Sequence, residues 1–147
     1  MASPGRVSGS KARVGVLCSR VRLEEKRIFQ ALRERSVPFE RIDARQLTFS
    51  LGKNGSDYVG SPAICSSQSA IPFDVVLIRC LSQTRGLCAA RLFEQQGVRT
   101  VNTYRALKTC GDKVLTTIAL TEHGVPTPQT AVAFSQRTAL ATMDAFG

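Results

Sequence analysis

The chain has 147 residues, of which 43% are hydrophobic and 21% charged, and its formal net charge is +9 at pH 7. A chain of this size buries roughly 70% of its unfolded surface, so one domain can form a core without disulfides or metal ions. The composition argues against a wholly disordered chain, and no apolar run approaches the roughly 18 residues that a membrane-spanning helix needs. The positive charge allows an acidic protein or a nucleic acid as partner, although a solvated surface of mixed charge is the simpler interpretation.

Residues 1–12 lack the apolar run of a secretory signal and are expected to form a disordered tail. The five cysteines form no C-x-x-C pair, and with His123 as the one histidine the chain lacks the ligands of a usual zinc site. We therefore predict no metal site. The cysteines are expected to be small buried hydrophobic residues of a reduced, cytoplasmic protein.

The first half of the chain predicts a strand, a helix and a second strand. The short β-branched run from Arg13 to Cys18 indicates a buried strand, and the spacing of apolar residues predicts a helix from Leu23 to Arg35. Alternating residues from Phe39 to Asp43 predict the next strand. Residues 50–72 are rich in Gly, Ser and Pro, so a long loop is expected there.

The same pattern returns after this loop. A strand is predicted from Asp74 to Arg79, then a helix that contains Ala89 to Phe93 and stops at Gly97, then a short strand from Arg99 to Val101. Strands that alternate with single helices imply a parallel sheet with helices on both faces. The predicted fold class is therefore α/β, with one domain over residues 13–103.

A second unit is predicted over residues 104–147. It is expected to begin with a turn from Tyr104 to Lys108 and a helix from Asp112 to His123 that ends at Gly124. An extended segment from Thr127 to Phe134 is expected to form a new strand, and Ser135 to cap a last helix from Gln136 to Phe146. The new strand and helix lack partners for their apolar faces. We therefore expect this unit to be a linker and the truncated beginning of a larger domain.

Several well-known catalytic and nucleotide-binding motifs are absent. The first strand is followed by Ser19-Arg20 rather than by the Gly-rich turn of a dinucleotide-binding unit. The glycines of a P-loop do not precede Lys113, and there is no G-x-S-x-G segment. We predict no catalytic residue within this chain, and His123 is expected to be a surface or helix-capping residue.

A polar cluster follows the strand that ends at Arg79. Arg79, Ser82, Gln83 and Arg85 lie where open α/β sheets place their ligands, and two guanidinium groups there could hold a carboxylate or a phosphate. Alternatively, Ser82 or Thr84 caps the next helix and the arginines are solvated. Farther along, Lys113 follows the helix-capping Asp112, where a cation opposes the helix dipole; it either serves an anion or is simply solvated.

Two strings carry a family resemblance. In RCLSQTRGLCAARLFEQQGVRTVN (79–102) and CGDKVLTTIALTEHGVPTPQTAVAFS (110–135), and at the final MDAFG, the sequence resembles the LysX group of RimK-like ATP-grasp ligases. These enzymes join an amino acid to the C-terminal glutamate of the small acidic carrier LysW. The resemblance implies a small parallel-sheet, Rossmann-like pre-ATP-grasp domain followed by an ATP-grasp module, of which this chain covers roughly the first half.

The resemblance also implies roles for particular residues. Lys113 corresponds to the first of two lysines that contact the ATP phosphates, and Arg79, Ser82, Gln83 and Arg85 become candidates for substrate or inter-domain contacts. The second lysine and the acidic Mg²⁺ ligands would lie beyond Gly147. ATP and Mg²⁺ are thus expected for the complete enzyme, whereas this chain alone is expected to bind neither tightly and to be inactive.

The implied partners are an acidic LysW-like carrier, an amino-acid substrate related to alpha-aminoadipate or glutamate, and further copies of the chain; a membrane is not expected. The positive charge fits an acidic carrier. The residues leave two other interpretations open. The chain could be a basic binding module without catalysis, whose DNA binding would depend steeply on salt, or a non-functional fragment.

Overall fold

The structure is a computed structural model that describes residues 12–52, 55–60 and 71–146. The chain divides into two compact units, Met1–Leu107 and Lys108–Gly147. Nearly all of the expected tail at residues 1–12 lies outside the described residues, as do residues 61–70 of the predicted loop.

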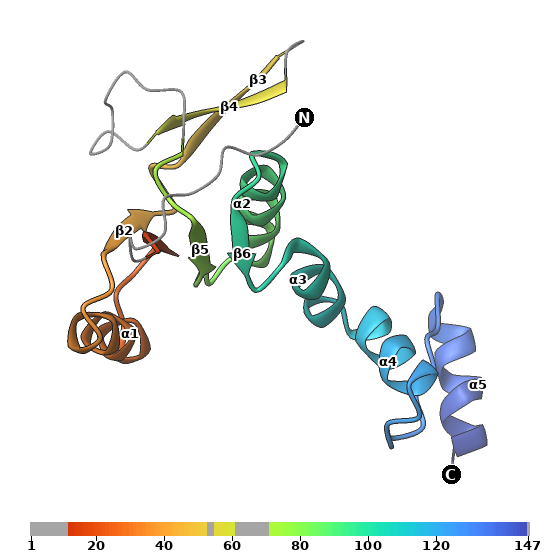
Figure 1. Ribbon diagram of the computed structural model, residues 1–147. Coiled ribbons are helices and arrows are strands. Elements are labelled where there is room, and N and C mark those ends of the chain that lie inside the picture. Colours follow the sequence, from red (N-terminus) through yellow and green to blue (C-terminus); the bar gives the residue numbers. More distant parts are fainter. Residues whose placement is uncertain (1–11, 53–54, 61–70, 147) are drawn as a thin grey trace. The chain divides into compact units, whose positions relative to one another are not determined.

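Strands are confined to the first unit among the described residues (Figure 1). They are β1 (Val14–Cys18), β2 (Phe39–Asp43), β3 (Thr48–Gly52), β4 (Gly55–Gly60), β5 (Val75–Ile78) and β6 (Arg99–Val101). The first unit also holds α1 (Leu23–Glu34) and α2 (Gln83–Gln95), whereas α3 (Tyr104–Gly111) continues across the boundary between the units. The second unit holds α4 (Lys113–Glu122) and α5 (Gln136–Phe146).

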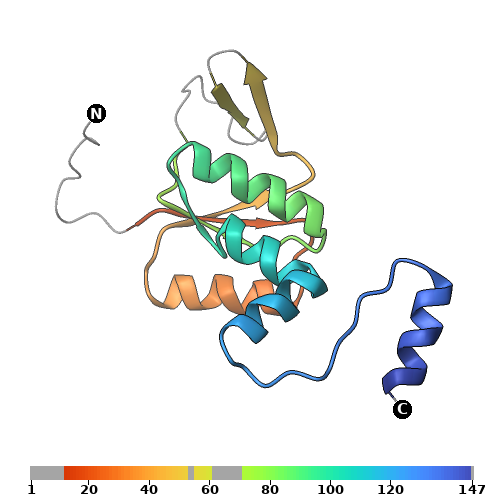
Figure 2. The same cartoon turned by 90° about the vertical axis from the view of Figure 1, so that its right-hand side faces the viewer.

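The main sheet has the strand order β2-β1-β5-β6, and every neighbouring pair is parallel. Val14 at the start of β1 lies opposite Phe39 of β2 and Val75 of β5, so the three strands begin level with one another. α1 and α2 cover opposite faces of this sheet (Figure 2). The predicted α/β class with a parallel sheet is confirmed.

β1 is buried along its whole length because helices cover both of its faces. Leu17 packs with Phe93 of α2 on one face, and Val16 packs with Phe29 of α1 on the other. Gly15 leaves room for its neighbours, since a Cβ atom there would lie 2.8 Å from Ile42 Cδ1 and 3.2 Å from the Phe73 ring. The apolar run that predicted this strand thus supplies the centre of the core.

The expectation of a loop throughout residues 50–72 was wrong for its first part. β3 and β4 form an antiparallel hairpin in which Gly52 pairs with Gly55. The Gly, Ser and Pro content of residues 50–72 suggested a loop, but in this part cross-strand pairing satisfies the backbone hydrogen-bonding groups that a loop would expose to water. Phe49 also ties the hairpin to the core, with its ring edge-on to Phe93 at 5.3 Å between centroids.

Two expectations after residue 103 were also wrong. The predicted turn at Tyr104 is the start of helix α3, whose first N–H groups are capped: Glu94 Oε1 accepts from Tyr104 N at 2.7 Å, and Thr103 Oγ1 accepts from Ala106 N at 3.2 Å. The segment expected as a strand from Thr127 to Phe134 forms none. Prolines before and within it remove N–H donors, and no strand of the described residues pairs with it.

Candidate functional site

The carboxyl ends of the parallel strands form one edge of the main sheet. β1 and β5 are neighbours, but β1 continues through α1 to β2 on one side, whereas β5 continues through α2 to β6 on the other. Open α/β sheets bind ligands at such a point, where the direction of the strand order reverses. The candidate site of the first unit is therefore the edge at the ends of β1 and β5.

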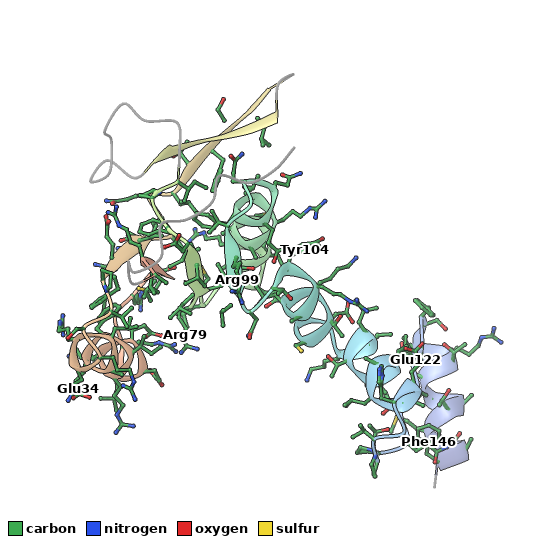
Figure 3. The ribbon with its side chains drawn as sticks, viewed as in Figure 1. Glu34, Arg79, Arg99, Tyr104, Glu122 and Phe146 are labelled. Carbon is green, nitrogen blue, oxygen red and sulfur yellow. The ribbon has the colours of Figure 1, made fainter. Side chains whose placement is uncertain are left out.

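A buried carboxylate lies at this edge. Glu25, in the first turn of α1, is fully buried. Arg22 donates to it from the backbone N and from Nε, each 3.1 Å from Oε2, and from Nη2, 3.2 Å from Oε1. Arg79 reaches from the end of β5 with Nε and Nη2, each 3.1 Å from Oε1 (Figure 3). Two arginines thus share one carboxylate.

The arginines change the protonation chemistry of this cluster. The side-chain hydrogen bonds from Arg22 lower the pKa of Glu25 to about 2 and outweigh burial, which acts in the opposite direction; Arg79 adds to the lowering. The hydrogen bond to Glu25 in turn raises the pKa of Arg22. At neutral pH the buried part of the cluster therefore carries two positive charges and one negative charge, and the exposed carboxylate of Glu24 lies beside it, with Oε2 3.8 Å from Arg22 Nε.

The four residues predicted for this edge have different roles. Ser82 is the N-cap of α2, with Oγ accepting from Arg85 N at 3.4 Å, and Gln83 Nε2 donates to the carbonyl of Leu107 in α3 at 2.8 Å. The Arg85 side chain is exposed and has no partner within the described residues. Of these four residues, Arg79 pairs with Glu25 and Arg85 is exposed to solvent. Ser82 caps α2, and Gln83 makes a hydrogen bond between α2 and α3.

Arg85 also lies near the thiol of Cys80. Burial raises the pKa of Cys80 to about 11, the buried Cys18 adds to this increase, and the charge of Arg85 opposes it. A thiol with this pKa is protonated at neutral pH and is a poor nucleophile. This edge therefore supplies arginine cations rather than a reactive cysteine.

A second carboxylate at the same edge repeats the pattern. Asp43, the last residue of β2, accepts from Arg45 Nη2 at 2.6 Å and from Arg41 Nη2 at 3.2 Å. Hydrogen bonds from the Arg45 side chain and backbone hold the pKa of Asp43 well below its usual range. Each of the two carboxylates is thus paired with two arginines, which leaves an excess of positive charge at the edge.

The candidate site of the second unit lies at the start of α4. Asp112 caps this helix as predicted, its Oδ1 accepting from Val114 N at 2.8 Å and Leu115 N at 3.0 Å. Lys113 is the first helical residue; it is exposed, and its ammonium group has no partner in the described part of the chain. It borders a cavity of about 440 Å³ that is otherwise lined mainly by apolar atoms of α4 and of residues 130–132.

Some site types are not found among the described residues. Over residues 12–52, 55–60 and 71–146, no group of three His, Cys, Asp or Glu side chains could hold a metal ion. In the same ranges, no helix has the length and apolar character needed to cross a bilayer.

The expectation of buried cysteines was wrong for Cys88 and Cys110, which are exposed. The buried positions of α2 include Gly86, Ala89, Ala90 and Phe93, and Cys88 falls outside this helical stripe. α3 has no fully buried residue, so it offers Cys110 no such position. Cys65 lies outside the described residues.

Two important carboxylates escaped the sequence analysis. Glu25 was not among the predicted site residues, although its position three residues after the N-cap matches the spacing of a capping box. No pattern in the sequence singled out Glu94. Its Oε1 accepts from Thr100 Oγ1 at 2.6 Å as well as from Tyr104 N, contacts that no local pattern in the sequence indicates.

Comparison with known proteins identifies the fold and the family. The chain belongs to the LysX preATP-grasp domain family, whose model matches residues 14–109. A RimK domain protein of the ATP-grasp class from Sphaerobacter thermophilus has the same fold, with a TM-score of 0.68 and 22% identity over 92% of this chain and 46% of that one.

Curated relatives point in the same direction. Over 87% of this chain and 40% of its own length, the Glutamate--LysW ligase ArgX of Sulfurisphaera tokodaii is 33% identical. The Alpha-aminoadipate--LysW ligase LysX of the same organism is 28% identical over 86% of this chain and 41% of its own length. The chain thus spans about two fifths of the length of these relatives.

Proposed function

We propose that this chain is the front portion of an ATP-dependent ligase that joins an amino acid of the glutamate or alpha-aminoadipate class to the C-terminal glutamate of an acidic LysW-type carrier. Residues 13–103 would be its pre-ATP-grasp domain, and residues 104–147 would begin the ATP-grasp domain. Family membership and the names of the curated relatives support this function.

The proposed reaction has two steps. The terminal phosphoryl group of ATP passes to the carboxylate of the carrier glutamate, which gives an acyl phosphate and ADP. The amine of the amino acid then attacks the acyl carbon, loses a proton and expels inorganic phosphate. Mg²⁺ would neutralise charge on the phosphates. Since the described residues include no metal-binding group, the proposal assigns no magnesium ligand to them.

Lys113 is the residue of this chain that we assign to ATP. The family resemblance suggests this assignment, and the observation in the structure that supports it is the unpaired ammonium group at the edge of a mainly apolar cavity. A cation at a helix N-terminus costs a few tenths of a kcal/mol, roughly, so Lys113 does not serve the stability of α4. A phosphate group would accept the charge that the helix disfavours.

The ligase assignment is tested by joining these 147 residues to the remaining part of the Sulfurisphaera tokodaii ArgX protein. We expect the joined protein to release ADP over many turnovers only when the carrier and the amino acid are both present, because the carrier alone supports the first step but not the second. Lys113→Ala should reduce the rate at least about tenfold, whereas Lys108→Ala, the matched exposed lysine of α3, should leave it unchanged. Equal rates for both variants would rule out the role of Lys113.

A basic binding module without catalysis is the second candidate. The excess of arginine around Glu25 and Asp43 favours it. Under this alternative, the chain alone would bind an acidic protein or DNA with an affinity that falls steeply with salt, and Lys113→Ala would have no special effect.

A further inference from the structure

The arginines that hold Glu25 use only one side of each guanidinium group. Arg22 binds the carboxylate with Nε and Nη2, and Arg79 also uses Nε and Nη2. A guanidinium has five N–H donors in a fixed plane, so each Nη1 group and the outer hydrogen of each Nη2 remain available. Within the described residues, no hydrogen bond uses these donors; the one further carboxylate beside them, Glu24, lies with Oε2 3.8 Å from Arg22 Nε, beyond hydrogen-bond distance.

The remaining donors are partly open to solvent at the point where the strand order reverses. The side chains of Arg22 and Arg79 are 41% and 37% exposed, whereas Glu25 is fully buried between them. The side chain of Glu25 is thus inaccessible to a ligand, but the arginines that it holds are accessible. An arginine held in this way loses little conformational entropy when it binds an anion.

We propose that Arg22 and Arg79 form a binding site for the carboxylate of a small ligand, with Glu25 as the positioning residue. This inference deepens the proposed function, because it gives the sheet edge a ligand of the chemical class to which glutamate belongs. The inference depends on the proposed function in one respect: that function identifies the bound carboxylate ligand as a substrate. Arg85, exposed and unpaired at the start of α2, adds positive charge to the same edge.

Charge and shape favour a carboxylate over a phosphate. Arg22 and Arg79 are opposed by the buried Glu25 and by the exposed Glu24, whose Oε2 lies 3.8 Å from Arg22 Nε, so a singly charged ligand meets less repulsion here than a dianion. A phosphate dianion would bring two negative charges close to the carboxylates of Glu24 and Glu25, and like charges in a partly buried site repel. The outward Nη1 and Nη2 donors of a guanidinium also match the two oxygens of a planar carboxylate.

The test follows the arginine Nε–H and backbone N–H signals of the 147-residue chain by NMR during titration with L-glutamate. Parallel titrations use inorganic phosphate and sodium chloride at matched ionic strength. Arg79→Lys keeps the charge beside Glu25 but removes the fork of donors, and Arg22→Lys does the same from α1. Arg41→Gln is the matched control, because Arg41 is also 41% exposed and also pairs with a carboxylate at this edge.

With L-glutamate, we expect saturable chemical-shift changes at Arg22 and Arg79. The affinity for L-glutamate should be at least about tenfold weaker in Arg79→Lys and in Arg22→Lys, and should change by less than about twofold in Arg41→Gln. If one lysine variant does not fold, the other decides. Shifts that do not saturate, that persist in the folded lysine variant or that phosphate produces at lower concentration would overturn the proposal. Since no ATP is present, the result is independent of the assignment of Lys113.

Discussion

Glu25 and Arg79 lie 54 residues apart in the sequence, and Arg79 Nε is 3.1 Å from Oε1 of the carboxylate. This pair joins α1 to the residue that follows β5, and so connects the two strand-helix-strand halves of the sheet at its carboxyl edge. Because Glu25 is fully buried, the pair excludes water on one side and leaves Arg79 partly open on the other. The fold thereby fixes the direction of an arginine for which the sequence left two interpretations open, a ligand-binding side chain and a solvated one.

The first prediction concerns acid stability. Since the pKa of Glu25 is about 2 in the folded protein and 4.5 in the reference state, its charged form stabilises the fold above pH 4.5, and this contribution is lost as the pH falls toward 2. Glu25→Gln should therefore lower the free energy of unfolding at pH 7 by about 1–3 kcal/mol and weaken its dependence on pH over this window. Urea denaturation at several pH values measures both effects.

Glu34→Gln is the control for this experiment, because Glu34 belongs to the same helix but is exposed. It should change the free energy of unfolding by less than about 0.5 kcal/mol. An unaltered pH dependence in Glu25→Gln would mean that Glu25 is not the carboxylate that senses acid. Asp43→Asn would then be the variant to compare, since the pKa of Asp43 is lowered as well.

The second prediction contrasts two buried glycines. In Gly15→Ala the new methyl group would meet Ile42 and the Phe73 ring inside the core, and we expect a loss of about 1–3 kcal/mol of stability. In Gly86→Ala the nearest atoms, on Cys80 and Ile78, are 3.5 Å away, an ordinary contact. Since alanine favours the helix, this variant should be neutral or more stable by up to about 1 kcal/mol. Thermal unfolding of both variants decides, and the opposite order would refute the packing described for β1.

The third prediction concerns the attachment of α3. Glu94→Ala removes the acceptor of Tyr104 N and Thr100 Oγ1, and should destabilise the chain by about 1–3 kcal/mol. Hydrogen exchange should accelerate most at the start of α3, while β1 keeps its protection. Glu122→Ala, near the end of α4, is the control and should leave α3 unchanged. If both variants leave exchange at Tyr104 as it was, Glu94 does not cap this helix.

The fourth prediction concerns thiol reactivity. Cys88 and Cys110 are exposed and should react with a thiol reagent within minutes at pH 8, whereas Cys18 is buried and should react only on unfolding. Cys80 should react slowly even where solvent reaches it, because its pKa is about 11 and little thiolate exists at that pH. Mass spectrometry of the labelled peptides identifies each site. Early labelling of Cys18 or Cys80 would contradict the described burial.

The sequence predicted much of this fold because local patterns match it. β2, β6 and α5 have the predicted bounds, and Ser82, Asp112 and Ser135 cap the helices that they were expected to cap. The hairpin at Thr48–Gly60 and helix α3 escaped prediction, because each depends on contacts made at a distance. Phe49 reaches Phe93, and Glu94 caps Tyr104 from another helix.

The candidate site was predictable only in part. The end of a strand indicated Arg79 as a site residue, but nothing near it in the sequence indicated that Glu25 would be its partner. Ser82 and Gln83 were chosen for their chemistry, whereas their side chains make structural hydrogen bonds. The assignment of Lys113 to ATP came from a family resemblance. Its exposed position beside the cavity supports this assignment, but Lys113 makes no contact within the described residues that would indicate a ligand.

Calorimetric titration with ATP is the most direct test of the central claim that this chain supplies a lysine for the ATP phosphates of a ligase. The measurement uses the protein joined to the rest of the Sulfurisphaera tokodaii ArgX protein and compares Lys113→Ala with Lys108→Ala. We predict that Lys113→Ala binds ATP at least about tenfold more weakly without any loss of thermal stability, and that Lys108→Ala binds like the parent. Equal ATP affinity in the parent and in Lys113→Ala would contradict the account.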